Sequence, residues 1–195
     1  MEGPQVIADA RRLAAGLGQL PAPEARPTII VVSGLPGTGK SYFCRRLAER
    51  LPFLVLEGDA LRKHLFTAPT YSASESAYLF RTVHRLIEGL LRKGIPIILD
   101  ATNLSERHRE RLYNIAERLN ARLVLVRVEA PPELVQERLK ARLKHGQRED
   151  NSDADWTVYQ KMKATVQKIN RNHFVVDTSR DITPALDKIV RGVNR

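Results

Sequence analysis

The sequence lacks the features of membrane proteins, disulfide-rich proteins and multi-cysteine metal sites. Its 195 residues include one cysteine, Cys44, which can form neither an internal disulfide nor a multi-cysteine zinc site. The longest apolar runs, such as residues 95–101, are interrupted by charge well before the roughly 20 residues that cross a bilayer. The first residues show no apolar core followed by a small-residue cleavage site, so no secretory signal is indicated. We expect a cytoplasmic protein with no membrane association.

Aromatic residues are also scarce at 6%, whereas basic residues are in excess and the formal net charge is +10. A basic protein suits an acidic partner such as nucleic acid or a phosphorylated ligand. The excess lies mainly in residues 40–66 and 102–148, and both segments contain groups that could face a triphosphate. Part of the charge therefore requires no polynucleotide partner.

Two kinds of apolar pattern alternate along the chain. Strand-like runs occupy residues 28–34, 53–59, 95–101, 122–129 and 173–179, and segments with helical spacing lie between them at 40–51, 74–93, 105–119, 132–144 and 153–169, with a last one from 183. Strands without internal polar alternation, joined by helices, are typical of a parallel sheet covered on both faces. We predict a doubly wound α/β domain with a parallel five-stranded sheet over residues 28–195, preceded at 1–27 by a helix and a proline-rich linker.

The most specific motif is GLPGTGKS at residues 34–41, directly after the first strand and directly before a helix. This spacing and context match the phosphate loop. Its glycines let the backbone approach phosphates, and the helix N-terminus directs unpaired amides at the anion. Lys40 is expected to reach the outer phosphates, and the Ser41 hydroxyl to bind Mg²⁺. The predicted ATP-binding segment is Gly34, Leu35, Pro36, Gly37, Thr38, Gly39, Lys40, Ser41 and Tyr42.

Missing motifs narrow the class of phosphate-loop protein. A GTPase requires DxxG and NKxD, and neither string occurs in the sequence. A motor-type ATPase usually places a water-orienting Glu directly after its magnesium-supporting Asp, but here Asp100 is followed by Ala101 and Thr102. The remaining classes are a kinase and a nucleotide-sensing module.

An acidic and a basic residue follow the second strand, where Asp59 and Arg62 are spaced i, i+3 in an incipient helical turn. The carboxyl end of a parallel strand faces the same crevice as the phosphate loop. Asp59 is therefore a candidate base for a hydroxyl acceptor, and Arg62 a candidate ligand for an anionic part of that acceptor. The alternatives are a helix N-cap for Asp59 and a surface ion pair for Arg62.

The third strand ends in Asp100, which we expect beside Ser41, holding the magnesium or its waters. Thr102 and Asn103 follow; they either cap the next helix or contact the substrate. Arg138 and Arg142 are spaced i, i+4 on the helix before a glycine-containing loop. On a lid they could contact the donor phosphates, and Arg142 is our preferred transition-state contact, whereas pairing of Arg138 with neighbouring acids is the alternative.

Three other arginines are candidates on weaker grounds. Arg148 lies in the loop after the lid helix, and Arg180 lies just after the last strand, near the expected position of the adenine base. Arg81, on the helix 74–93, lies where it could line an acceptor channel, although solvent exposure is an equal alternative.

Taken in order, GLPGTGKS, GDALR, LDATN, ERLKAR, NSDADWTVYQKM and FVVDTS resemble the phosphate-loop kinases that include 5'-hydroxyl polynucleotide kinases, zeta-toxin-like kinases and small-molecule kinases. The resemblance covers residues 28 to about 180 and implies an adenylate-kinase-like fold with a helical lid. It implies that Asp59 is the general base and that Arg62 holds the phosphate 3' to the acceptor. The family's DxTN element maps onto Asp100, Thr102 and Asn103, and its lid arginine onto Arg138 or Arg142.

We therefore expect an enzyme that uses ATP and Mg²⁺ to phosphorylate a hydroxyl acceptor, with a polynucleotide 5'-hydroxyl end as the leading acceptor. A small-molecule kinase acting on a metabolite, nucleoside, sugar or antibiotic is the alternative. A third hypothesis is an ATP-sensing module without catalysis, but such a module needs no proton acceptor facing the γ-phosphate. The sequence identifies no protein partner.

Overall fold

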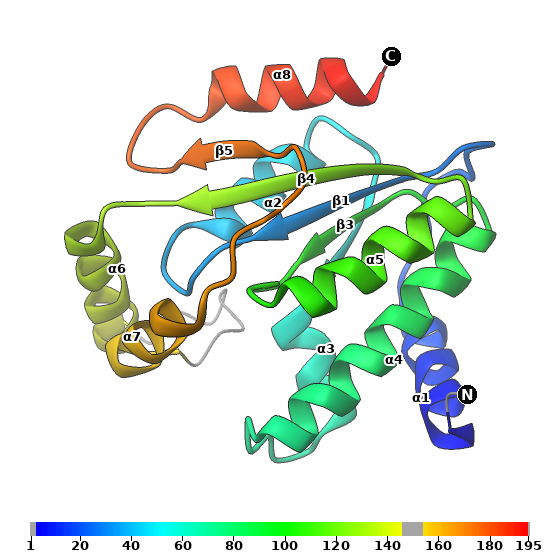
Figure 1. The fold of residues 1–195 in the computed structure, drawn as a ribbon, viewed down its shortest axis with the longest axis horizontal. Coiled ribbons are helices and arrows are strands. Elements are labelled where there is room, and N and C mark those ends of the chain that lie inside the picture. The colour runs from blue at the N-terminus through cyan, green and yellow to red at the C-terminus, as the bar shows by residue number, and fades with distance from the viewer. Residues whose placement is uncertain (1–2, 146–153, 195) are drawn as a thin grey trace.

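Five parallel strands form one central sheet in the order β2-β3-β1-β4-β5 in the computed structural model, which describes residues 3–145 and 154–194 (Figure 1). The strands are β1 (Thr28–Ser33), β2 (Leu54–Glu57), β3 (Ile97–Asp100), β4 (Arg122–Glu129) and β5 (Phe174–Asp177). All neighbouring strands pair in parallel. The predicted doubly wound α/β architecture is confirmed.

Helices cover both faces of the sheet, with α2 and α8 on one face and α4 and α5 on the other (Figure 1). The helices are α1 (Pro4–Ala15), α2 (Lys40–Ala48), α3 (Gly58–Leu65), α4 (Ala73–Arg92), α5 (Glu106–Arg118), α6 (Pro132–His145), α7 (Trp156–Thr165) and α8 (Thr183–Val193). Two helices differ from the sequence prediction. The turn expected after β2 is a complete helix, α3, and α7 ends at Thr165 rather than near residue 169.

The sheet separates two hydrophobic cores, and β1 contributes to both because successive side chains point to opposite faces. Ile29 and Val31 belong to the core under α4 and α5. Ile30 and Val32 belong to the core under α2 and α8. Every residue of β1 is buried, which explains why this strand shows no polar alternation in the sequence.

Strand register brings the ends of three neighbouring strands to one level. Asp100, the last residue of β3, is the register partner of Val32 in β1 and of Glu57 in β2. The glycine loop follows β1, and α3 follows β2. The loop, Asp100 and the start of α3 therefore meet at the carboxyl edge of the sheet, where open α/β sheets bind ligands.

The N-terminal helix α1 packs against α4 with its apolar face. Val6, Ala10 and Leu13 are each 5% exposed, and the Tyr78 hydroxyl of α4 donates a 2.6 Å hydrogen bond to Asp9. That hydrogen bond lowers the pKa of Asp9. The sequence alone did not indicate whether this helix packs on the domain. Within residues 3–145 and 154–194, no helix combines the length and the apolar character needed to span a bilayer.

Replacing Leu13 by alanine tests whether α1 is part of the folded unit. Leu13→Ala should lower the free energy of unfolding by about 2–4 kcal/mol, because the change removes a buried side chain and leaves a cavity. Leu20→Ala, at a residue that is 37% exposed, is the matched control and should change it by less than about 0.5 kcal/mol. Urea unfolding of both variants measures the difference, and equally small effects would show that α1 does not stabilise the domain.

Candidate active site

A cavity of about 180 Å³ lies at the carboxyl edge of the sheet, between the glycine loop, the start of α3 and the side of α4. The cavity is lined by most of the residues that the sequence singles out. They are Pro36, Gly37, Gly39, Lys40, Ser41, Tyr42, Asp59, Arg62, Asp100, Thr102, Asn103 and Arg142. Segments more than 100 residues apart in the sequence therefore contribute to a single site.

The glycine loop has a backbone that favours glycine at several positions, Gly34 and Gly39 among them. Gly39, the N-cap of α2, has φ +87°, and a Cβ there would lie 3.0 Å from the Thr178 hydroxyl oxygen. A Cβ on Gly34 would lie 2.4 Å from the carbonyl oxygen of Val128 in β4. No side chain caps α2, so its first amides are available to an anion.

Gly34, Leu35 and Thr38 belong to the predicted ATP-binding segment but do not line the cavity, and the last two support the loop. The Leu35 carbonyl accepts hydrogen bonds from the Thr38 hydroxyl at 2.7 Å and from Lys40 Nζ at 3.0 Å. Thr38 is 4% exposed. Lys40 is thereby held over the loop, where its ammonium group can exchange the carbonyl for a phosphate oxygen.

Asp100 and Ser41 form the candidate magnesium site. The Asp100 carboxylate is 6% exposed and accepts a hydrogen bond from the Ser41 hydroxyl. Burial raises the pKa of Asp100, while Lys40 and Ser41 act in the opposite direction. The described residues contain no group of three or more His, Cys, Asp or Glu side chains placed to hold a metal. One carboxylate and one hydroxyl fit Mg²⁺, which usually completes its shell with phosphate oxygens and water.

Asp59 lies in the first turn of α3, and its side chain lines the cavity. The helix N-cap is Glu57, so the alternative N-cap role does not fall on Asp59. Glu57 itself also lines the cavity, although it was not predicted from the sequence. Its position at the end of β2, level with Asp100, was the signal that could have found it.

The two lid arginines have different positions. Arg142 lines the cavity. Arg138 lies one helical turn earlier, outside the cavity lining, and donates to the Thr178 hydroxyl at 2.8 Å, the Thr178 carbonyl at 3.0 Å and the Gly37 carbonyl at 3.5 Å. Arg138 therefore joins α6 to the glycine loop and to the segment after β5, whereas Arg142 is placed to meet a ligand.

Asn103 fixes the segment after β3. Its amide donates to the Val32 carbonyl at 2.8 Å, and its own carbonyl accepts from the Ser33 hydroxyl at 3.1 Å and from the fully buried Arg109. The N-cap of α5 is Ser105, so Asn103 does not cap that helix. The main contribution of Asn103 is to tie the end of β1 to the loop that carries Thr102.

The remaining predicted residues lie away from the cavity or outside the described residues. Arg81 contacts the ring of Tyr78, with its Cζ 5.9 Å from the ring centre, and faces a groove beside α1 and α5. Arg180 has a side chain that is 83% exposed and pairs with Asp177 at 3.4 Å. Arg148 lies outside the residues that the structure describes.

Residues of α4 complete the cavity and were not expected there. Leu79, Phe80, Val83 and His84 are among its lining residues. His84 is buried, with 5% of its surface exposed. No local pattern could have found this wall, because it depends on how α4 crosses α3.

A parallel sheet with a glycine loop at the end of its first strand, followed by a helix that starts in Gly-Lys-Ser, defines a phosphate-loop nucleotide-binding protein. Residues 29–169 match the family described as the AAA domain. The chain belongs to this family.

One curated protein with a more specific description is similar to part of this chain. The L-seryl-tRNA(Sec) kinase of Methanococcus maripaludis is 28% identical over 128 residues, which cover 63% of this chain and 48% of that protein. The chain thus spans about half the length of this curated relative.

Solved structures share the fold at low identity. The Mycobacterium tuberculosis APS kinase CysC, in complex with AMPPNP and APS, has a TM-score of 0.67 at 18% identity, covering 89% of this chain and 100% of that one. Chaetomium thermophilum Kti12, in complex with ADP-AlF3, has a TM-score of 0.68 at 19% identity, covering 85% and 96%. Both likenesses support the phosphate-loop kinase fold.

Replacing Asp100 by asparagine should separate stability from ligand binding. Because the folded state raises the pKa of this carboxyl group, its ionised form is less favourable in the folded protein than in the unfolded chain at neutral pH. Asp100→Asn should therefore keep or increase the thermal stability of the protein without nucleotide, and weaken Mg²⁺-dependent ATP binding. Thermal unfolding with and without Mg·ATP measures both effects. A less stable variant that binds Mg·ATP normally would contradict the assignment.

Proposed function

We propose that this chain is an ATP-dependent kinase that transfers the γ-phosphoryl group to a hydroxyl acceptor. The observation that carries the proposal is that Asp59 shares one cavity with Lys40 and Ser41 of the glycine loop. A protein that only sensed ATP would need the loop, but it would not need a carboxylate across the cavity from it. The resemblance of the motifs to phosphate-loop kinases supports the same assignment.

Phosphoryl transfer requires positioning and charge neutralisation more than covalent chemistry from the protein. In the proposed reaction, the acceptor oxygen attacks the γ-phosphorus, the bond to the bridging oxygen of ADP breaks, and the acceptor proton moves to Asp59. Lys40 and the amides at the start of α2 hold the phosphates. Arg142 offsets the negative charge on the transferred group. Ser41 and Asp100 would hold Mg²⁺, which would supply positive charge to offset that of the phosphates.

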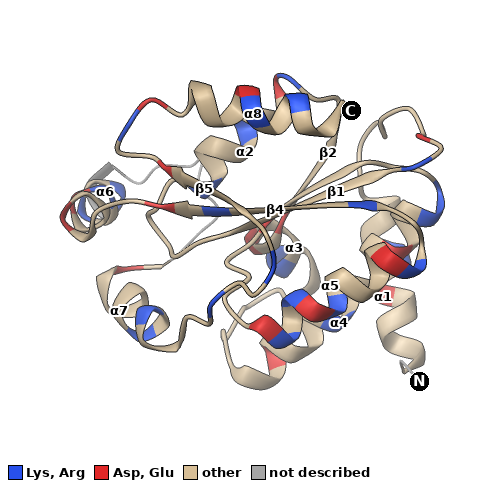
Figure 2. Cartoon of the chain, turned by 45° about the horizontal axis from the view of Figure 1, so that its top comes forward, with Lys and Arg blue, Asp and Glu red and all other residues tan. Residues whose placement is uncertain are grey.

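For the acceptor, we propose a small molecule in preference to a polynucleotide end. The structural neighbour is described as an APS kinase, which supports a small acceptor. The curated relative is described as a kinase of L-seryl-tRNA; this description names a nucleic-acid conjugate, but it is not that of a 5'-hydroxyl polynucleotide kinase. The charge distribution also supports a compact acceptor. Glu88 of α4 alone pairs with Arg85, Arg92 and Arg118, and acidic and basic residues lie side by side on α4 and α5 (Figure 2).

Incubation with γ-labelled ATP, Mg²⁺ and separate acceptor pools tests the proposal. The pools are small hydroxyl metabolites, nucleosides and sugars, and 5'-hydroxyl oligonucleotides of RNA and DNA. Label should move to a small molecule, and Asp59→Asn should lower kcat by about 10²–10⁴-fold with ATP affinity retained, because only proton transfer is lost.

Asp187→Asn is the control, since this aspartate pairs with Arg50 on the surface of α8, and it should leave kcat unchanged. Label on oligonucleotides alone would restore the polynucleotide hypothesis. Unchanged transfer by Asp59→Asn would remove the base assignment, and ATP binding without transfer to any pool would favour the sensing module.

A further inference from the structure

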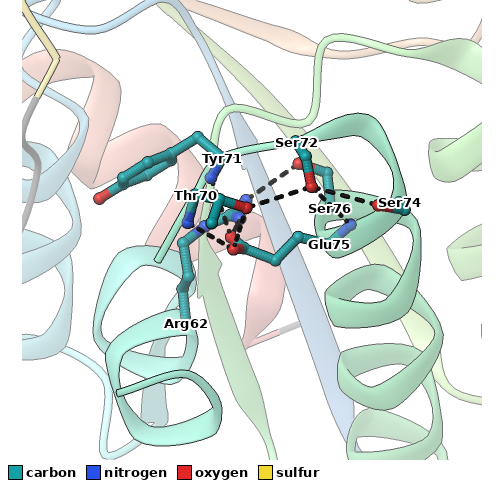
Figure 3. Close-up of polar contacts among 7 residues, drawn as sticks. All are labelled: Arg62, Thr70, Tyr71, Ser72, Ser74, Glu75 and Ser76. Atoms are coloured by element: carbon teal, nitrogen blue, oxygen red, sulfur yellow. Dashed lines mark hydrogen bonds and ion pairs between the residues drawn. The ribbon is translucent and has the colours of Figure 1, made fainter. Parts of the chain in front are cut away.

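Arg62, the basic residue of the Asp59–Arg62 pair, is already engaged by acidic and polar groups of α4. Its Nη1 donates to the Glu75 carboxylate, and its Nη2 to the Ser76 hydroxyl at 3.3 Å (Figure 3). The ring of Tyr71 covers the guanidinium, with its centre 4.8 Å from Cζ. The side chains of Arg62 and Glu75 are only 9% and 7% exposed. The arginine charge at this wall of the cavity is thus matched by a buried carboxylate.

Glu75 is itself held in place by the segment that joins α3 to α4. Its carboxylate accepts from the Thr70 amide at 2.6 Å, the Thr70 hydroxyl at 2.8 Å and the Tyr71 amide at 3.2 Å (Figure 3). Burial acts to raise the pKa of Glu75, but the bonds from Thr70 and Arg62 outweigh it and lower the pKa to about 2. Glu75 is therefore ionised throughout the physiological pH range. It cannot swing away from Arg62 without breaking several hydrogen bonds.

The rest of this wall carries no positive charge. From α4 it consists of the apolar Leu79, Phe80 and Val83, together with His84. Burial, with help from His108 and Arg111, lowers the pKa of His84 to about 4, so its imidazole is neutral at pH 7. Apart from Arg62, the positive groups of the cavity are Lys40, Arg45 and Arg142, which come from α2 and α6.

We propose that the acceptor subsite between α3 and α4 takes an uncharged hydroxyl compound with an apolar face, and that Glu75 determines this preference by holding the charge of Arg62. This inference rests on the proposed kinase function. An acceptor phosphate at Arg62 would have to compete with Glu75, and a displaced carboxylate would be left buried without its cation, which is strongly unfavourable.

Pairs of acceptors that differ by one phosphate test the inference: a nucleoside against its 3'-monophosphate, and a sugar alcohol against its phosphate monoester. With the unmodified protein, Mg²⁺ and γ-labelled ATP, kcat/KM should be at least about tenfold higher for the uncharged member, as expected for one charge-assisted contact. Glu75→Gln should reduce this ratio by about tenfold, because it releases the charge of Arg62 while an amide oxygen still accepts from Thr70. Preference of the unmodified protein for the phosphorylated member would overturn the inference and leave the kinase assignment intact.

Glu88→Gln is the matched control, since Glu88 also lies on α4 and also pairs with arginines, but outside this cavity. It should leave the ratio unchanged, and an unchanged ratio in Glu75→Gln would remove the role of Glu75. The ratio of kcat/KM values for the unmodified protein can be measured even if a variant fails to fold. If no acceptor is phosphorylated, the kinase proposal fails. Equilibrium binding of the same pairs in the presence of Mg·AMPPNP then tests the charge preference of the subsite. Tighter binding of the uncharged member would support the preference, and any other result would overturn it.

Discussion

The parallel register of β2, β3 and β1 is the constraint on which the site depends. It sets Glu57, Asp100 and Val32 level with one another, so the segments that follow all three strands leave the sheet at the same height. The glycine loop follows one of these strands and α3 another. A slip of one residue in β3 would turn Asp100 toward the opposite face of the sheet, away from the Ser41 hydroxyl that now donates to it.

Patterns that are local in sequence predicted much of this arrangement. The five strands are recognisable as short, mainly apolar runs between helical segments, and β1 and β3 are buried along their whole length. The glycine loop is recognisable because GLPGTGKS requires a strand before it and a helix after it. Asp59 and Asp100 followed from their positions at strand ends. The different roles of the two arginines of α6 could not be predicted, because their spacing places Arg138 and Arg142 on the same face of the helix. Only the packing of α6 shows that Arg138 donates to Thr178 and that Arg142 lines the cavity.

The interactions of Arg62 could not be predicted from the sequence for a related reason. The sequence shows Ser72 and Glu75 at the spacing of a capping box, and the Ser72 hydroxyl does accept from the Glu75 amide at 3.3 Å. That pattern predicts a helix start, which is correct, but it does not indicate that the Glu75 side chain reaches across to α3. A basic residue 13 positions earlier has no periodic relation to the glutamate. Only the fold brings the two together.

The net charge of the chain is weaker evidence for a polyanionic partner once the ion pairs of its arginines are known. A value of +10 favours a polyanionic partner when all charges are treated as free, yet several arginines are held by carboxylates, Arg62 by Glu75 and Arg109 by Glu106 among them. The other positive groups that line the cavity, Lys40, Arg45 and Arg142, come from α2 and α6 beside the glycine loop, where a triphosphate would bind. In the kinase that we propose, the cavity is thus divided into a cationic donor side and an acceptor side on which the charge of Arg62 is matched by Glu75. This division allows the nucleotide to be bound by charge and the acceptor to be selected by shape and hydrogen bonding, so that the two ligands do not compete for the same groups.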